Sequence, residues 1–109
     1  MRRGEVFTAS ARGPSTGKPR PVVIIQAARF DATGSVTVCP LTTNPVDAPL
    51  ARIPIAPSAM NGLDQPSSLM VDKVMTMPRA SLRARLGRLP DDDLVRLNRA
   101  LIVVLGLAG

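Results

Sequence analysis

Between residues 4 and 72 the chain alternates short apolar runs with clusters of Pro, Gly, Asn and Ser, and this alternation constrains the fold more than any other feature. Short apolar runs bounded by turn-forming residues are typical of β-strands. Small, strongly bent antiparallel sheets of such short strands usually close into a barrel. We predict strands at residues 4–9, 21–27, 35–41, 52–55, 68–72, 74–77 and 86–89.

The apolar runs differ in a way that predicts their place in the sheet. Residues 22–25 are apolar at every position, which is typical of a central strand buried on both faces. Residues 52–55 alternate, and Pro54 lacks the N–H that a central strand needs, so we predict an edge strand there. Residues 31–34 and 61–62 have the residue types typical of tight turns, so we predict turns there, the first of them between the second and third strands.

The C-terminal part of the chain predicts helix. We expect a short helical turn at residues 78–85 and a stronger helix beginning at residues 90–93, whose acidic side chains suit the positive end of a helix dipole. An apolar stripe follows at helical spacing, formed by Leu94, Leu97 and Leu101. Residues 100–105 are apolar all round, so the end of the helix needs cover either from a second subunit or from the protein's own core.

Composition bounds the size and class of the protein. The chain has 109 residues, enough for one modest core, so we expect residues 1–109 to form a single domain. Phe7 and Phe30 are its only aromatic residues, so the core must be aliphatic. Fourteen Lys and Arg against eight Asp and Glu give a formal net charge of +6. This excess favours a polyanionic partner, either a nucleic acid or an acidic protein segment.

Rare and absent residue types exclude several chemistries. The chain contains no His, which removes the usual general acid/base and the commonest zinc ligand, so we expect no metal and no cofactor. Cys39 is the single cysteine, which excludes an internal disulfide. No secretory signal is visible, and the apolar run at residues 100–105 is too short to span a bilayer. We therefore expect a cytoplasmic protein that does not engage the membrane.

Arg20 is the first candidate functional residue. Pro19 and Pro21 restrict the backbone on both sides of it, so its guanidinium is aimed in one direction. The planar fork of a guanidinium can hold two phosphate oxygens at once. Thr42 and Thr43 end another apolar run, and their hydroxyls are candidates to lie near that cation. Together these residues indicate RNA as the partner.

RNA can be cleaved without metal or histidine, because the ribose 2′-hydroxyl is itself a nucleophile next to the phosphate. The protein then has to stabilise the crowded, charged phosphorus centre and move protons. Arg20 suits the first task but is a poor proton acceptor, since a guanidinium stays protonated. Threonine can orient a phosphate oxygen or the leaving 5′-oxygen. The group that accepts the 2′ proton is left open, with Asp72 as one candidate.

The order and spacing of several motifs resemble the MazF/PemK (Kid) toxins of toxin–antitoxin pairs over nearly the entire chain. These motifs are Arg2-Arg3-Gly4-Glu5-Val6, Arg20-Pro21-Val22-Val23, Pro40-Leu41-Thr42-Thr43, Asp72 with Thr76-Met77-Pro78-Arg79, and Gly87-Arg88-Leu89 before the terminal helix. The resemblance implies a mainly β fold, a small SH3-like antiparallel β-barrel with a C-terminal helix, assembled as a homodimer. It also implies a metal-independent endoribonuclease that is neutralised by a cognate acidic antitoxin.

The same resemblance implies roles for individual residues. Arg20 and Thr42 match the catalytic pair of the family, and Thr43 and Asp72 match supporting positions. The substrate would be single-stranded RNA, messenger RNA first, with transfer and ribosomal RNA as further candidates. Cleavage would leave a 2′,3′-cyclic phosphate and a free 5′-hydroxyl. In the loop before Arg20, the further RNA-binding candidates are Ser15, Thr16 and Lys18.

The sequence departs from the family pattern at two places. The loop of residues 12–19 is shorter than usual and lacks a common Ser-Glu pair, and Met70 stands where some relatives carry arginine. Both departures leave the RNA sequence preference open.

The two rival functions are a CcdB-like DNA gyrase poison and a basic barrel that binds RNA without cutting it. The gyrase poisons use a Trp-containing C-terminal end, and this chain contains no Trp.

Overall fold

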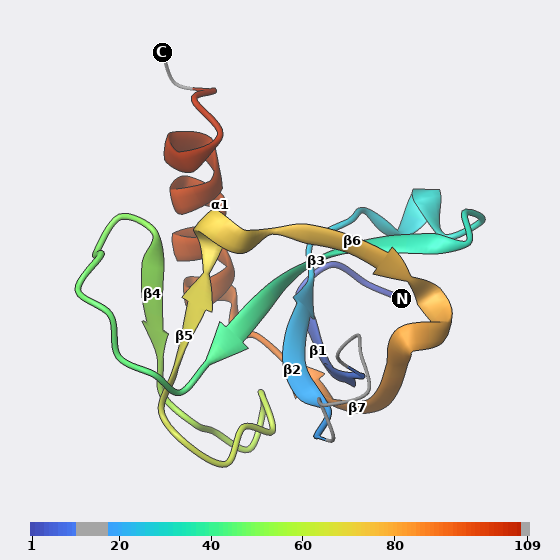
Figure 1. Cartoon of the computed structure of the whole chain (residues 1–109), viewed down its shortest axis with the longest axis horizontal. Coiled ribbons are helices and arrows are strands. Elements are labelled where there is room, and N and C mark those ends of the chain that lie inside the picture. Colours follow the sequence, from blue (N-terminus) through green and yellow to red (C-terminus); the bar gives the residue numbers. More distant parts are fainter. Residues whose placement is uncertain (11–17, 108–109) are drawn as a thin grey trace.

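The computed structural model describes residues 1–10 and 18–107. Seven strands and one helix make up about half of this part of the chain (Figure 1). The strands are β1 (Glu5–Ala9), β2 (Arg20–Ile24), β3 (Ser35–Thr42), β4 (Arg52–Ile55), β5 (Ser67–Met70), β6 (Met75–Pro78) and β7 (Leu82–Arg88). The helix is α1 (Asp91–Val104), and three 3-10 turns are η1 (Ala28–Phe30), η2 (Val71–Lys73) and η3 (Arg79–Ser81).

The strands form one antiparallel sheet in the order β4-β5-β3-β2-β1-β7, with β6 also paired to β3. The long strand β3 therefore connects two parts of the sheet, because it pairs with β2 and β6 along its length and with β5 at its end. Among the described residues β4 and β7 do not pair with each other, so the sheet is barrel-like without closing. The predicted mainly β fold with a C-terminal helix is confirmed.

Two apolar clusters lie on the two faces of the sheet. Val23 belongs to the cluster that packs against α1, whereas Val22 and Ile24 belong to the other cluster. All three side chains are buried, because neighbouring residues of a strand point to opposite faces. This explains why β2 is apolar at every position and confirms its predicted central place. The predicted edge strand is also confirmed, since β4 pairs only with β5 and Pro54 is exposed.

The region before α1 differs from the prediction. The helical turn predicted at residues 78–85 is wrong, because only the 3-10 turn η3 forms there and β7 begins at Leu82. Arginine and alanine favour helix locally, but β7 pairs with β1, which lies far away in the sequence. The strand predicted at residues 68–72 also ends early, at Met70, and Asp72 lies in η2.

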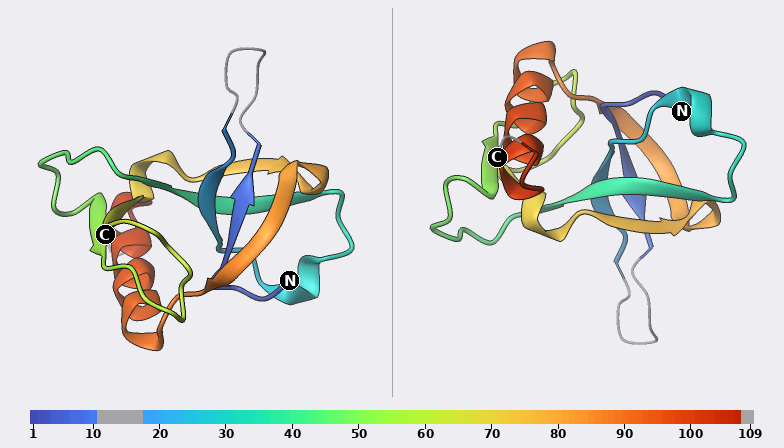
Figure 2. Two further views of the ribbon diagram at one scale, coloured as in Figure 1. Left: turned by 90° about the horizontal axis from the view of Figure 1, so that it is seen from below. Right: turned by 90° about the horizontal axis from the view of Figure 1, so that it is seen from above.

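Helix α1 packs beside β4 and η2, as both views in Figure 2 show. Leu97, Ala100 and Leu101 are buried in the core cluster on this side. The C-terminal end of the helix stays apolar and exposed, and its uncovered side chains are Ile102, Val103, Leu105 and Leu107. The protein's own core covers only one side of this end, through Ala100, Leu101 and Val104. No helix in residues 1–10 and 18–107 is both long and apolar enough to cross a membrane.

The single thiol lies inside the core. Cys39 is fully buried in β3, and this burial raises its pKa to about 12, with the negative charge of Asp72 contributing in the same direction. Because only the thiolate reacts rapidly with disulfide reagents, we expect the native protein at pH 8 to resist labelling by Ellman's reagent. Denaturant should release one reactive thiol per chain. Fast labelling of the native protein would contradict this placement of Cys39.

Candidate functional site

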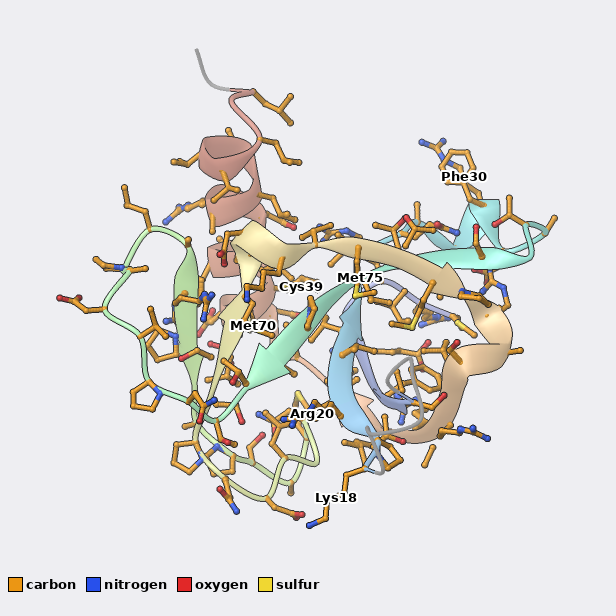
Figure 3. The ribbon with its side chains drawn as sticks, in the orientation of Figure 1. Lys18, Arg20, Phe30, Cys39, Met70 and Met75 are labelled. Atoms are coloured by element: carbon orange, nitrogen blue, oxygen red, sulfur yellow. The ribbon has the colours of Figure 1, made fainter. Side chains whose placement is uncertain are left out.

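Arg20 is the first residue of β2, and its side chain lies at that end of the strand, next to a cleft. It pairs with Ala9 of β1, and Pro21 pairs with Thr8. The side chain is exposed and makes no ion pair with any described residue. Figure 3 shows Arg20 beside the loop that leads into β5, with Lys18 further out on the same side. The two cations are therefore presented together at the entry of β2.

A cleft of about 440 Å³ opens beside Arg20. Its volume lies within the roughly 300–1,000 Å³ range of sites that hold small ligands. The walls come from β1, the entry of β2, the end of β3, the loop before β5, and β7. The polar residues that line it are Thr8, Lys18, Arg20, Thr43, Asp64, Gln65 and Ser67. Two positive charges and one negative charge leave this surface with an excess positive charge, which suits a phosphate.

The strand-end threonines lie at the same end of the sheet as Arg20. Val22 of β2 pairs with Pro40 of β3, so Arg20 and Thr42 each lie two residues beyond that pair. Thr43 lines the cleft directly. Thr42 is the half-buried residue before it, and its hydroxyl accepts a hydrogen bond of 3.1 Å from the backbone N–H of Asn44. Thr43 thus shares the cleft with Arg20, and Thr42 adjoins its wall.

Asp72 lies elsewhere. Arg52 of β4 donates two hydrogen bonds to it, from Nε to Oδ1 at 2.9 Å and from the terminal nitrogen to Oδ2 at 3.3 Å. These hydrogen bonds lower the pKa of Asp72, so any stabilisation from this pair is present above the pKa of the unfolded carboxyl and is lost as the pH falls through the folded value. Asp72 is not among the residues that line the cleft, so the structure does not bring it together with Arg20.

Four of the polar residues that line the cleft were not predicted as site residues from the sequence, namely Thr8, Asp64, Gln65 and Ser67. Thr8 lies within β1, and the other three residues follow Asn61-Gly62, where the sequence predicts a turn but no functional site. Their placement depends on packing between distant strands, for which no local signal exists. Ser15 and Thr16, predicted as RNA-binding candidates, lie outside the described residues.

A second pocket, of about 560 Å³, lies at the start of β1 and the end of β7. It is larger and contains four arginines, but two of them are already paired with carboxylates. Arg85 pairs with Glu5 at 2.5 Å and Arg88 pairs with Asp91 at 3.7 Å. The cleft beside Arg20 has no such pairing among the described residues, so we take it as the candidate site. The described part of the chain contains no group of three or more potential metal ligands.

Comparison with known proteins gives consistent matches along the chain. A protein family described as "PemK-like, MazF-like toxin of type II toxin-antitoxin system" matches residues 2–105. The chain is 62% identical over 109 residues to a "Probable endoribonuclease MazF" of Mycolicibacterium smegmatis, with all of both chains covered. It is 28% identical over 113 residues to an "Endoribonuclease MazF" of Staphylococcus saprophyticus, with 98% of this chain and 92% of the relative covered.

Solved structures share the fold. The structure of the Mycobacterium tuberculosis toxin MazF-mt6 superposes with a TM-score of 0.79 at 27% identity, covering 94% of this chain and 96% of that chain. An endoribonuclease solved in complex with its cognate antitoxin, from a mycobacterial species, has a TM-score of 0.80 at 23% identity, covering 98% of this chain and 96% of that chain. At that lower identity the likeness concerns the fold alone.

Proposed function

The chain belongs to the PemK-like, MazF-like toxins of type II toxin–antitoxin systems, and from this membership we propose that it is an endoribonuclease that cuts single-stranded RNA through the ribose 2′-hydroxyl. One observation carries the site assignment. Arg20, which is exposed and has no ion partner among the described residues, shares a cleft with Thr43, and the preceding Thr42 lies at the same end of the β2–β3 pair as Arg20. The 62% identity to a probable endoribonuclease supports the activity itself.

Arg20 and Thr42 are the proposed catalytic pair. The 2′-oxygen attacks phosphorus, the bond from phosphorus to the 5′-oxygen breaks, and the products carry a 2′,3′-cyclic phosphate and a 5′-hydroxyl. Arg20 holds the non-bridging oxygens and stabilises the charge that builds up on them. Thr42 orients a phosphate oxygen or the leaving 5′-oxygen, with Thr43 beside it. A base accepts the proton of the 2′-hydroxyl, and the leaving 5′-oxygen is protonated. Neither proton transfer requires a metal.

The remaining proposed properties concern partners and location. A cognate antitoxin with an acidic segment fits the net charge of +6 and would cover the basic cleft. A homodimer fits the exposed apolar end of α1, which a second subunit would bury. Messenger RNA is the first substrate class, and transfer and ribosomal RNA remain candidates. We place the protein in the cytoplasm, where these substrates occur, and treat residues 1–109 as one domain.

The activity is tested by incubating the purified protein with a long RNA in excess EDTA. We expect cleavage that the chelator does not reduce, because the nucleophile is the ribose hydroxyl. The new 3′ ends should resist poly(A) polymerase until the cyclic phosphate is removed, and the new 5′ ends should accept phosphate from polynucleotide kinase directly. RNA binding without cleavage would favour the non-catalytic barrel instead. A break in DNA that depends on gyrase would favour the gyrase poison, which the comparisons do not support.

A further inference from the structure

The loop between β4 and β5 places a carboxylate in the cleft beside two cations. Asp64 lines the same cleft as Lys18 and Arg20, is exposed, and makes no ion pair with any described residue. A free carboxylate in a phosphate-binding cleft repels the phosphate and weakens binding of the RNA backbone. Asp64 can therefore favour RNA binding only if it contacts a part of the RNA other than the phosphate.

The loop that carries Asp64 is held in one conformation. Asn61 is fully buried, and its side-chain oxygen accepts hydrogen bonds of 3.0 Å from the N–H groups of Ser58 and Leu63. Its side-chain nitrogen donates to the carbonyl of Ala56 at 2.9 Å. Every one of these bonds fixes the backbone just before Asp64.

Packing against β7 adds to this rigidity. The N–H of Arg88 donates to the carbonyl of Met60 at 2.9 Å, and Gly62 lies so close to Leu86 that no side chain would fit between them. The buried Leu63 anchors the loop to the core beside Asp64. A functional group on a rigid element can discriminate between ligands, because it does not adapt to a wrong one.

We propose that Asp64 reads the RNA base next to the scissile phosphate and selects bases that carry an exocyclic amino group over uracil. This inference rests on the proposed ribonuclease function. With the phosphate held at Arg20 and Lys18, the base of the adjoining nucleotide is the part of the RNA that meets the opposite charge in the same cleft. A carboxylate only accepts hydrogen bonds, so it pairs with the amino group of cytosine, adenine or guanine. Uracil has no amino group, and the single N–H on its pairing edge lies between two carbonyl oxygens that the carboxylate repels, so uracil binds less well.

The test compares three proteins on one RNA pool randomised around the cleavage site: the wild type, Asp64→Asn and Asp92→Asn. Asp64→Asn keeps the shape of the side chain and adds an N–H donor that uracil can accept. Asp92→Asn is the matched control, because Asp92 is exposed in the first turn of α1 and makes no ion pair with a described residue. Sequencing of the 5′ ends gives the rate for each base at each position.

We expect the wild type to disfavour uracil at one position flanking the cut by roughly tenfold, in line with one lost or repulsive base contact. Asp64→Asn should reduce this preference to about twofold or less at that position alone, and Asp92→Asn should leave it unchanged. If Asp64→Asn alters cleavage of all sequences equally, Asp64 acts only as a charge, and if it alters none, Asp64 does not contact the RNA during cleavage; either result makes the inference wrong. A wild-type protein that cuts no RNA in the pool would overturn the proposed function and this inference with it.

Discussion

Replacing Arg20 with alanine should lower RNA cleavage by at least about 10³-fold, the range seen when a charge-stabilising donor or arginine is removed from a transition state. The Arg20 guanidinium lies at the start of β2, at the same end of the β2–β3 pair as Thr42 and in the same cleft as Thr43. There it would stabilise the negative charge that develops on the phosphate oxygens during cleavage. The fold should survive, because Arg20 is exposed and makes no ion pair with a described residue. We therefore expect a change in unfolding free energy of no more than about 0.5 kcal/mol.

The measurement is the initial rate of cleavage of a defined RNA, with far-ultraviolet circular dichroism and urea unfolding on the same preparations. Lys18→Ala is the matched control, since it removes an exposed cation from the same cleft but outside β2. Its cleavage should fall about tenfold or less, as expected for a flexible contact that only attracts the backbone. A folded Arg20→Ala protein that cuts RNA at the wild-type rate would remove Arg20 from the mechanism.

Elements whose local preference agrees with their place in the fold could be predicted from the sequence. The strand at Arg52–Ile55 and the helix Asp91–Val104 formed where alternation, proline and leucine spacing indicated them. The central place of β2 followed from its unbroken apolar run. In each case the order of apolar and polar residues along a short stretch of sequence determines which side chains are buried, so the element can be predicted from the sequence alone.

Other features depend on contacts between distant parts of the chain and left no local trace. Residues 83–85 favour helix but are held in β7 by pairing with β1. The candidate site shows the same division. Arg20 was identifiable because its neighbouring prolines mark it, whereas Asp64 lines the cleft only because Asn61 and Gly62 hold its loop against β7. A carboxylate after a turn is otherwise an ordinary surface residue.

The Asn61-Gly62 turn should tolerate substitution poorly, and Gly62→Ala should lower the unfolding free energy by about 3 kcal/mol or more. Gly62 has a φ of +69°, where a Cβ costs about 1–2 kcal/mol. A Cβ there would also lie 2.2 Å from the backbone oxygen of Leu86, and moving Leu86 would disturb its neighbours Arg85 and Gly87, which pair with β1. Overpacking of this kind typically costs about 1–3 kcal/mol more.

Urea unfolding at matched protein concentrations measures the effect, with Gly34→Ala as the control. Gly34 has no atom within 4 Å of the position a Cβ would take, so alanine there should change stability by no more than about 1 kcal/mol. RNA cleavage should fall in parallel for Gly62→Ala, because the displaced loop carries Asp64 in the cleft wall. Equal urea midpoints for the two variants would mean that the loop yields to the added methyl, and that Asp64 is not held rigidly enough to discriminate between bases.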